Sequence, residues 1–351
     1  MSSRYCTREA VKLAASIEGT DHDSTIDRLI EESSRAIDAE ARTRFIPITA
    51  TRVLPYSSRH LRGSKLYFDA DLISVTTFTD QGDDARAMTE GTHYFLQPEN
   101  EGPPYHWAEL KLSQTRVFEA DPDTAQRSFR IAGKWSAHNE TLAASQLDGA
   151  ISSTTATTLQ LDNGSKAGVG DTLLIETEQL FISDRDEVDL AVNAAGALTA
   201  DDTDTALSLG DPATDLAAGE IIRIDSERMR VVSVSSATAV VVERAWDGTN
   251  LASHTSTADI YVFRRYTVER GVNGTTAATH ADNTACTRYV VPRLIEQLAI
   301  AETIAAYQQE RAGWGRTIGG GERQMEFSGR QLSNLRARAV ARHRRHLMVS
   351  V

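Results

Sequence analysis

Two segments of this chain are each repeated once, and the two repeats have different spacings. Residues 158–182 align with residues 206–232. Residues 243–255 align with residues 269–281 through a shared pattern, Glu-Arg-x-x-[Asp/Asn]-Gly-Thr, which a histidine follows a few residues later. Self-similarity of this kind indicates a duplicated structural unit, and it constrains the topology more than any other feature of the sequence.

The two spacings together predict that one unit is nested inside the other. One complete unit begins near Ala206 and ends near Tyr261, and the halves of the second unit lie on either side of it. Insertion at an exposed loop tip adds little closure entropy, because that cost grows only with the logarithm of loop length. We also expect the acid-rich stretch from Asp184 to Glu220 to be largely mobile and solvated.

Helical periodicity marks both ends of the chain, and strand periodicity marks the middle. Thr7 can cap a first helix, Ser24 with Asp27 resembles a capping box for a second, and Pro292 suits the first turn of a third. The fold class expected is α+β: a helical platform from the N- and C-terminal helices, with inserted antiparallel β domains, one β unit nested in another. The expected parts are N-terminal helices at 1–47, an antiparallel β domain at 48–136, a linker at 137–150, an interrupted β module at 151–185 and 264–291, a nested β module at 186–263, a platform helix at 292–313, and a glycine hinge with an Arg-rich arm at 314–351.

Charge is distributed unevenly along the chain. The net charge is −12, yet the C-terminal arm, Arg323–His346, has seven arginines, no lysine and one acid, which leaves −18 on the rest. An acidic body disfavours general nucleic-acid binding, and a basic arm favours contact with a negative partner. Only two cysteines are present, so neither a disulfide framework nor a cysteine-based zinc site is expected. No apolar run is long enough to cross a membrane.

No motif of catalysis, cofactor binding or metal binding is present, so we expect no catalytic, cofactor-binding or metal-ligating residues, no cofactor and no enzyme activity. The Gly319–Gly321 run follows no strand and lacks the lysine of a phosphate loop, so it indicates a hinge. His254 and His280 follow matching Asp-Gly and Asn-Gly turns, which favours hydrogen bonding back across the loop. Glu178 and Glu227 occupy matching repeat positions, which points to packing.

The sequence resembles the head-to-tail connector proteins of tailed bacteriophages. The resemblance lies in the N-terminal helical pair, in the strand segment YFLQPENEG and in the Pro-started helix VPRLIEQLAIAETIAAYQQERAG. The segments GDTLLIETEQLFIS and ERGVNGTTAATH are similar to β modules of phage neck and tail proteins. Connectors of this family are usually much shorter, so the two β modules are a departure from it.

The resemblance implies a homo-oligomeric ring, commonly of twelve copies, that docks beneath the portal protein and extends the DNA channel. It implies a virion protein of the neck, made in the host cytoplasm, that contacts a downstream neck or tail protein and passes double-stranded DNA without tight binding. The interleaved arginines and apolar residues of the C-terminal arm favour a protein groove, which under this resemblance is the portal. Expected portal-binding residues are Arg330, Leu332, Leu335, Arg336, Arg338, Arg342, Arg344 and Arg345; expected inter-subunit residues are Ile26, Leu29, Ile30, Ile37, Leu294, Leu298 and Ile304.

Two other classes of function are compatible with the sequence. A tail-fibre or baseplate-type binding module would explain the β repeats and would predict glycan affinity or trimers, but it explains the helical ends poorly. A hydrolase has only scattered histidines and acids in its favour.

Overall fold

The computed structural model describes residues 3–82, 86–113, 115–211, 216–311 and 329–345. The chain is mostly β, with 39% of residues in strands and 22% in helices. The expected α+β fold on a helical platform is therefore wrong. The two expected β modules and the segment before them join through continuous hydrogen-bonded ladders into one antiparallel sheet of ten strands, while the β domain expected at 48–136 forms a second antiparallel sheet of seven strands.

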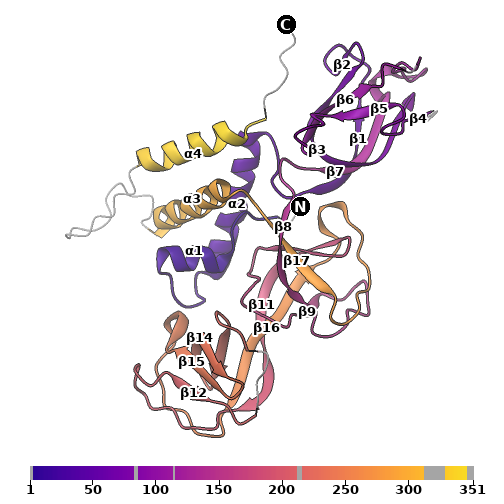
Figure 1. Cartoon of the computed structure of the whole chain (residues 1–351). Helices are drawn as coiled ribbons and strands as arrows, with labels where there is room; N and C mark the ends of the chain where they lie inside the picture. The colour runs from indigo at the N-terminus through magenta and orange to yellow at the C-terminus, as the bar shows by residue number, and fades with distance from the viewer. Residues whose placement is uncertain (1–2, 83–85, 114, 212–215, 312–328, 346–351) are drawn as a thin grey trace.

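The helices form one cluster beside the sheets (Figure 1). Thr7 caps the first helix as expected, since its hydroxyl accepts a hydrogen bond from the Ala10 amide at 3.2 Å. The second helix instead begins at Asp23 with His22 at the N-cap, so the expected Ser24 capping box is wrong. No helix in the described part of the chain is both long and apolar enough to span a membrane. The helices are α1 (Arg8–Ala15), α2 (Asp23–Ala41), α3 (Arg293–Arg311) and α4 (Gly329–His343).

The first sheet forms the lobe at the upper right of Figure 1. Its main path runs β1-β7-β3-β6-β5, and it encloses a core of its own that includes Phe129 and Trp135. The Trp135 indole donates to the Ala50 carbonyl at 2.9 Å, so this buried ring leaves no unpaired N–H. The strands are β1 (Ile48–Leu54), β2 (Leu61–Arg62), β3 (Lys65–Asp80), β4 (Arg86–Ala87), β5 (Tyr94–Gln97), β6 (Tyr105–Leu110) and β7 (Phe129–Trp135).

The second sheet runs β12-β15-β14-β13-β16-β11-β10-β17-β8, and β9 pairs with β16. The long strands β11 and β16 pair along their length through several bulges and pass from one core to another. One core includes Leu173 and Tyr266, and the other includes Ile222 and Val242. The strands are β8 (Glu140–Gln146), β9 (Thr158–Gln160), β10 (Thr172–Ile175), β11 (Glu178–Asn193), β12 (Ala206–Ser208), β13 (Ile221–Ile224), β14 (Glu227–Ser236), β15 (Ala239–Glu243), β16 (Asp259–Glu269) and β17 (Ala285–Val290).

Two expectations about loops are wrong in this sheet. The expected linker at 137–150 contains β8, whose pairing with β17 makes it an edge strand of the sheet. The acidic stretch from Asp184 to Glu220 contains most of β11 and all of β12, and it buries Ala194 and Leu198 in the nested core. Its acids alternate with apolar residues, so the charges face solvent while the apolar side chains face the core.

Candidate functional site: two buried Glu–Arg–His networks

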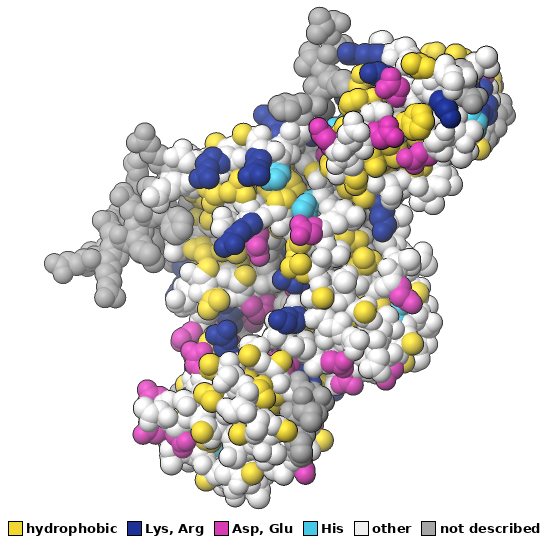
Figure 2. Space-filling model, in the orientation of Figure 1, with side chains coloured by type: hydrophobic (Ala, Val, Ile, Leu, Met, Phe, Trp, Pro, Cys, Tyr) yellow, Lys and Arg dark blue, Asp and Glu magenta, His cyan; other side chains and the backbone are white. Residues whose placement is uncertain are grey.

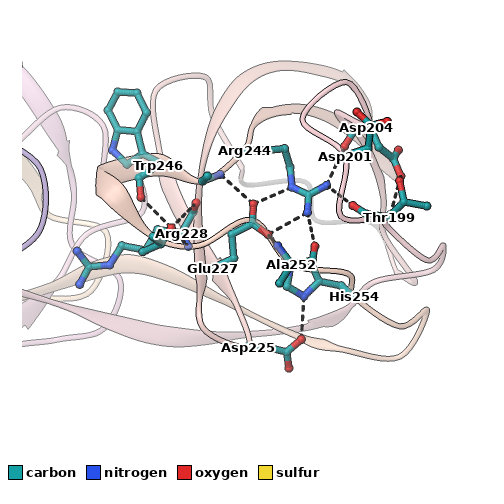
Figure 3. A network of polar contacts seen from close by, with 12 residues as sticks. Thr199, Asp201, Asp204, Asp225, Glu227, Arg228, Arg244, Trp246, Ala252 and His254 are labelled. Carbon is teal, nitrogen blue, oxygen red and sulfur yellow. Dashed lines mark hydrogen bonds and ion pairs between the residues drawn. The ribbon is translucent and has the colours of Figure 1, made fainter.

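The nested module, residues 186–263, is organised around the carboxylate of Glu227 at the start of β14 (Figure 3). The Glu227 side chain is fully buried beside Arg244, whose side chain is 1% exposed. The carboxylate accepts hydrogen bonds from Arg244 Nε (2.8 Å) and Nη2 (2.9 Å), from the amides of Ala245 (2.8 Å) and Ala252 (3.0 Å), and from His254 Nε2 (2.9 Å).

Every polar hydrogen of the Arg244 guanidinium is used. Besides its two bonds to Glu227, it donates to the backbone carbonyls of Thr199, Asp204 and Ala252. Because Arg has five N–H donors and no acceptor, five accepted bonds satisfy it completely. The network therefore ties three loop segments to one strand.

His254 completes the network from the loop that follows the Asp-Gly turn. Its Nε2 contacts Glu227, and its Nδ1 lies 2.8 Å from the carboxylate of Asp225. Each ring nitrogen therefore lies within hydrogen-bond distance of one carboxylate. The histidine was expected to bond back across its own loop; its side chain instead bonds to the β13–β14 hairpin, at Asp225 and Glu227.

The interrupted module, at 151–185 and 264–291, contains the same network at the matching positions. The Glu178 carboxylate accepts hydrogen bonds from Arg270 Nε at 2.7 Å and Nη2 at 2.8 Å, and it contacts His280 Nε2 at 2.8 Å. Glu176 pairs with His280 Nδ1 at 2.9 Å, as Asp225 does with His254. Arg270 also donates to the carbonyls of Ser153, Ala156 and Ala278.

These contacts set the protonation of the two glutamates. Burial alone would raise their pKa values, but the guanidinium, the imidazole and the backbone amides outweigh it and lower the pKa of Glu178 and of Glu227 to about 2. Each carboxylate is thus ionised and saturated with donors. A saturated, buried and duplicated ion cluster stabilises a loop, and it offers no free group for acid–base or nucleophilic chemistry. Within the described residues, no His, Cys, Asp and Glu side chains group as metal ligands.

The Asp-Gly and Asn-Gly turns beside these networks dock the two modules onto different neighbours. Asn273 donates to Gln179 at 2.9 Å, and Gly274 lies so close to the Thr49 carbonyl of β1 that a Cβ would come within 2.1 Å of it. In the nested module, Asp247 pairs with Lys12 of α1 at 3.0 Å. One turn therefore fixes a module to the first sheet, and its counterpart fixes the other module to α1.

A third buried ion pair joins the two modules. Glu220, fully buried, accepts from Arg264 Nε at 2.7 Å and from the Gly164 amide at 2.8 Å. Gly164 and Arg264 belong to the interrupted module, whereas Glu220 belongs to the nested one. The modules are thus held by this pair as well as by the continuous strands β11 and β16.

An ionic cleft of about 1660 Å³ lies between α1 and the two modules. Figure 2 shows basic and acidic side chains mixed where the helices face the lower lobes. Arg8 contacts Asp184 across it at 3.4 Å, and Glu9 accepts from the Val169 amide at 3.0 Å. Burial raises the pKa of Glu9 and raises that of Asp171 to about 6, although Arg288 beside Asp171 opposes the shift. The acids and bases of this cleft mainly neutralise each other.

The described part of the C-terminal arm, residues 329–345, packs on the molecule and does not project from it as expected. In α4, Ala339 is fully buried and Val340 is 5% exposed, and Leu332 and Leu335 pack on the helical cluster. The expectation that this apolar stripe waits for a partner is therefore wrong, because α2 and α3 of the same chain cover it.

The arginines expected to bind the portal divide into two groups. Arg336 pairs with Glu302 at 2.8 Å, and Arg345 is held beneath the first sheet, so both are engaged within the chain. Arg338, Arg342 and Arg344 are exposed. The side chain of Arg330 and the expected glycine hinge, Gly313–Gly321, lie outside the described residues.

The residues expected between subunits are likewise buried in the chain's own helical cluster. A neighbouring copy cannot reach them, because α1, α2, α3 and α4 already pack face to face. Leu294 is partly buried there, and the others are buried: Ile26, Leu29, Ile30, Ile37, Leu298 and Ile304. The expected inter-subunit role of this set is therefore wrong.

Arg244 and Arg270, the centres of the two networks, were not singled out by the sequence, although both stand in the repeated Glu-Arg-x-x-[Asp/Asn]-Gly-Thr pattern. The sequence signal that could have found them is that each arginine is repeated at the same position as its counterpart, as are the strand glutamates Glu178 and Glu227. No family model, no curated protein sequence and no solved structure matches this chain.

Proposed function

We propose that this protein is a structural head-to-tail connector of a tailed bacteriophage, assembled as a ring, commonly of twelve copies, beneath the portal. In this role it extends the DNA channel and presents a surface to a downstream neck or tail protein. The observation that carries the proposal is the way the chain is organised. Residues from both ends, from Tyr5 to Ala339, share one hydrophobic cluster, and the nested module extends from the interrupted module along β11 and β16.

Such an organisation suits an assembly protein. The first sheet and the two modules lie on different sides of the helices, so the molecule offers separate faces to separate partners (Figure 1). The sequence resemblance to connectors lies mainly in those same helices and in the YFLQ strand, β5. The nested and interrupted modules then add contact surface beyond that of the shorter family members.

The charge of the body fits the passage of DNA. Outside the C-terminal arm the net charge is −18. Each phosphate that a protein neutralises strengthens DNA binding by counterion release, so a conduit that releases its cargo avoids dense cationic lining. An acidic body meets that requirement.

Contacts between ring subunits need apolar residues that the chain itself leaves uncovered. Leu13 on α1 is 71% exposed and Leu142 on β8 is 47% exposed, and both line the ionic cleft. In a cyclic ring the contact is heterologous, so a different face of the next copy covers them. We therefore propose Leu13 and Leu142 as the contact between subunits, in place of the residues of α2 and α3 that are buried within the chain.

The portal contact is proposed for the solvent face of α4. Arg338 and Arg342 are four residues apart, so they lie on one side of the helix, and both are exposed. Guanidinium groups there would pair with carboxylates of the portal, and the contact would weaken as salt rises.

Co-sedimentation with the portal protein of the same virus tests this proposal. The double variant Arg338→Glu with Arg342→Glu is expected to lose co-sedimentation at moderate salt while unfolding at the same temperature as the unaltered protein. Arg127→Glu with Arg265→Glu, at two exposed arginines of the first sheet's lobe and of β16, serves as the control with the same charge change and is expected to sediment with the portal. Absence of portal binding by the unaltered protein contradicts the proposal.

The duplicated modules favour a second candidate, a tail-fibre or baseplate-type binding module. Repeated β units commonly present equivalent binding faces. This candidate predicts elongated trimers and affinity for glycans, and it assigns no role to the helical core. Binding to a glycan array without any binding to portal would support it over the connector.

A further inference from the structure

A groove of about 520 Å³ lies between the first sheet and the end of α4. Arg59 and Trp107 come from the first sheet's lobe, and Arg342, Arg344 and Arg345 come from the end of the chain. Figure 2 shows basic side chains over α4, with histidine beside them toward this lobe. The groove thus combines several cations with aromatic rings at the junction of two parts of the fold.

Arg345 is built into this groove by contacts on three sides. Its amide donates to the Ala41 carbonyl at 3.0 Å, and its Nη2 donates to the Phe68 carbonyl at 2.7 Å. Its Nε lies 3.7 Å from Asp71, and its side chain is only 10% exposed. The remaining nitrogen, Nη1, is buried and has no hydrogen-bond partner. A buried, charged donor without an acceptor is costly, and native proteins seldom leave one unfilled.

The groove has a surplus of donors. The Trp107 indole N–H is also buried without an acceptor. The acids of the groove are already engaged, since Asp71 accepts from Thr43 at 2.6 Å and contacts His106 at 3.3 Å, and Asp69 pairs with Arg52. The unpaired N–H donors of Arg345 and Trp107 can therefore be satisfied by a hydrogen-bond acceptor from outside the chain.

Three further arginines surround this surplus. Arg59, Arg342 and Arg344 are exposed, and within the described residues none of them has an acidic partner. They approach from opposite sides, one from the loop between β1 and β2 and two from the end of α4. Guanidinium forks arranged around a hollow match an oxyanion with several acceptor oxygens better than they match a single carboxylate.

We propose that this groove is a phosphate-binding site. A phosphate group has acceptor oxygens only, so it can satisfy Arg345 Nη1 and the outer arginines together, and the Tyr67 and Trp107 rings supply faces for an attached base. The phosphate can come from a free anion or from a nucleic-acid backbone, and the chemistry of recognition is the same. This inference does not depend on the proposed function.

Isothermal titration calorimetry on the full chain tests the site with two probes, inorganic pyrophosphate and a ten-nucleotide single-stranded DNA without terminal phosphates. Arg59→Ala and Arg342→Ala remove groove arginines without breaking any contact of the described fold. Each is expected to weaken binding about 3- to 10-fold. Arg338→Ala removes an exposed arginine of the same helix that does not line the groove, and it is expected to change binding less than 2-fold.

The outcomes separate the possibilities. Binding of pyrophosphate alone, weakened by both groove variants, identifies a free phosphate ligand. Binding of the oligonucleotide with the same dependence identifies a nucleic-acid backbone. If neither probe binds, or if both groove variants bind as the unaltered protein does, the site is refuted. Arg338→Ala separates this test from that of the proposed function, because Arg338 belongs to the proposed portal contact but does not line the groove.

Discussion

Replacing Glu227 with glutamine tests whether the buried networks hold the modules together. The substitution keeps the size of the side chain but removes the charge that five donors share. It leaves Arg244, 1% exposed, as a buried cation without a counter-ion, and it turns an amide N–H toward donors. Breaking a buried ion pair by removing one partner costs about 3–5 kcal/mol. We expect a loss of that size in the stability of the nested module.

Hydrogen–deuterium exchange read by mass spectrometry measures the effect where it occurs. Peptides from β13 to β15 should lose protection in Glu227→Gln, whereas peptides from β10 should keep it, because the two modules have separate cores. Glu243→Gln is the matched control: Glu243 forms an exposed pair with Arg230 at 3.7 Å, which contributes at most about 1 kcal/mol.

Coupling to the partner arginine sharpens the test. In the double variant Glu227→Gln with Arg244→Met, the stranded cation is gone, so the loss should be smaller than the sum of the two single losses. If Glu227→Gln costs no more than Glu243→Gln, or if the two modules lose protection equally, the reasoning about these networks is refuted.

Three further outcomes follow from the structure. Because the pKa values of Glu178 and Glu227 are lowered, the stability that these carboxylates contribute is complete above about pH 4.5 and is lost as the pH falls toward 2. The urea midpoint of unfolding should therefore fall across that pH range, and it should fall less steeply in the double variant Glu178→Gln with Glu227→Gln. An equal pH dependence of the two urea midpoints contradicts this. Deleting residues 186–263 and joining Arg185 to Arg264 with Asn-Gly should leave a cooperatively melting protein by circular dichroism, because Arg185 and Tyr266, which both remain, are already paired across the ribbon; a broad, non-cooperative melt contradicts it. Leu13→Glu should weaken assembly in analytical ultracentrifugation without lowering the melting temperature, since Leu13 is 71% exposed; assembly equal to that of the unaltered protein contradicts the ring contact.

Local signals in the sequence predicted several parts of the site. The repeat alignment paired Glu178 with Glu227 and His254 with His280, and the structure places each pair in equivalent networks. This worked because a duplicated motif keeps the spacing between residues that must meet. Thr7 was found for a similar reason, since an N-cap depends only on residues within one turn.

Long-range packing could not be predicted from local patterns. The sequence gives no measure of how far β11 and β16 extend, so one ten-stranded sheet was divided into small domains. The apolar stripe of α4 predicted a groove on a partner protein, but periodicity does not say which surface covers a stripe, and Leu335 packs on the chain's own helices. Ser24 failed as a cap because α2 begins one residue earlier.

Electron microscopy of the purified protein, alone and mixed with the portal of the same virus, tests the connector proposal most directly. We expect closed rings stacked coaxially on the portal, with the β lobes of each subunit on different sides of the ring wall. Elongated trimers, or particles that remain single in the presence of portal, would contradict it.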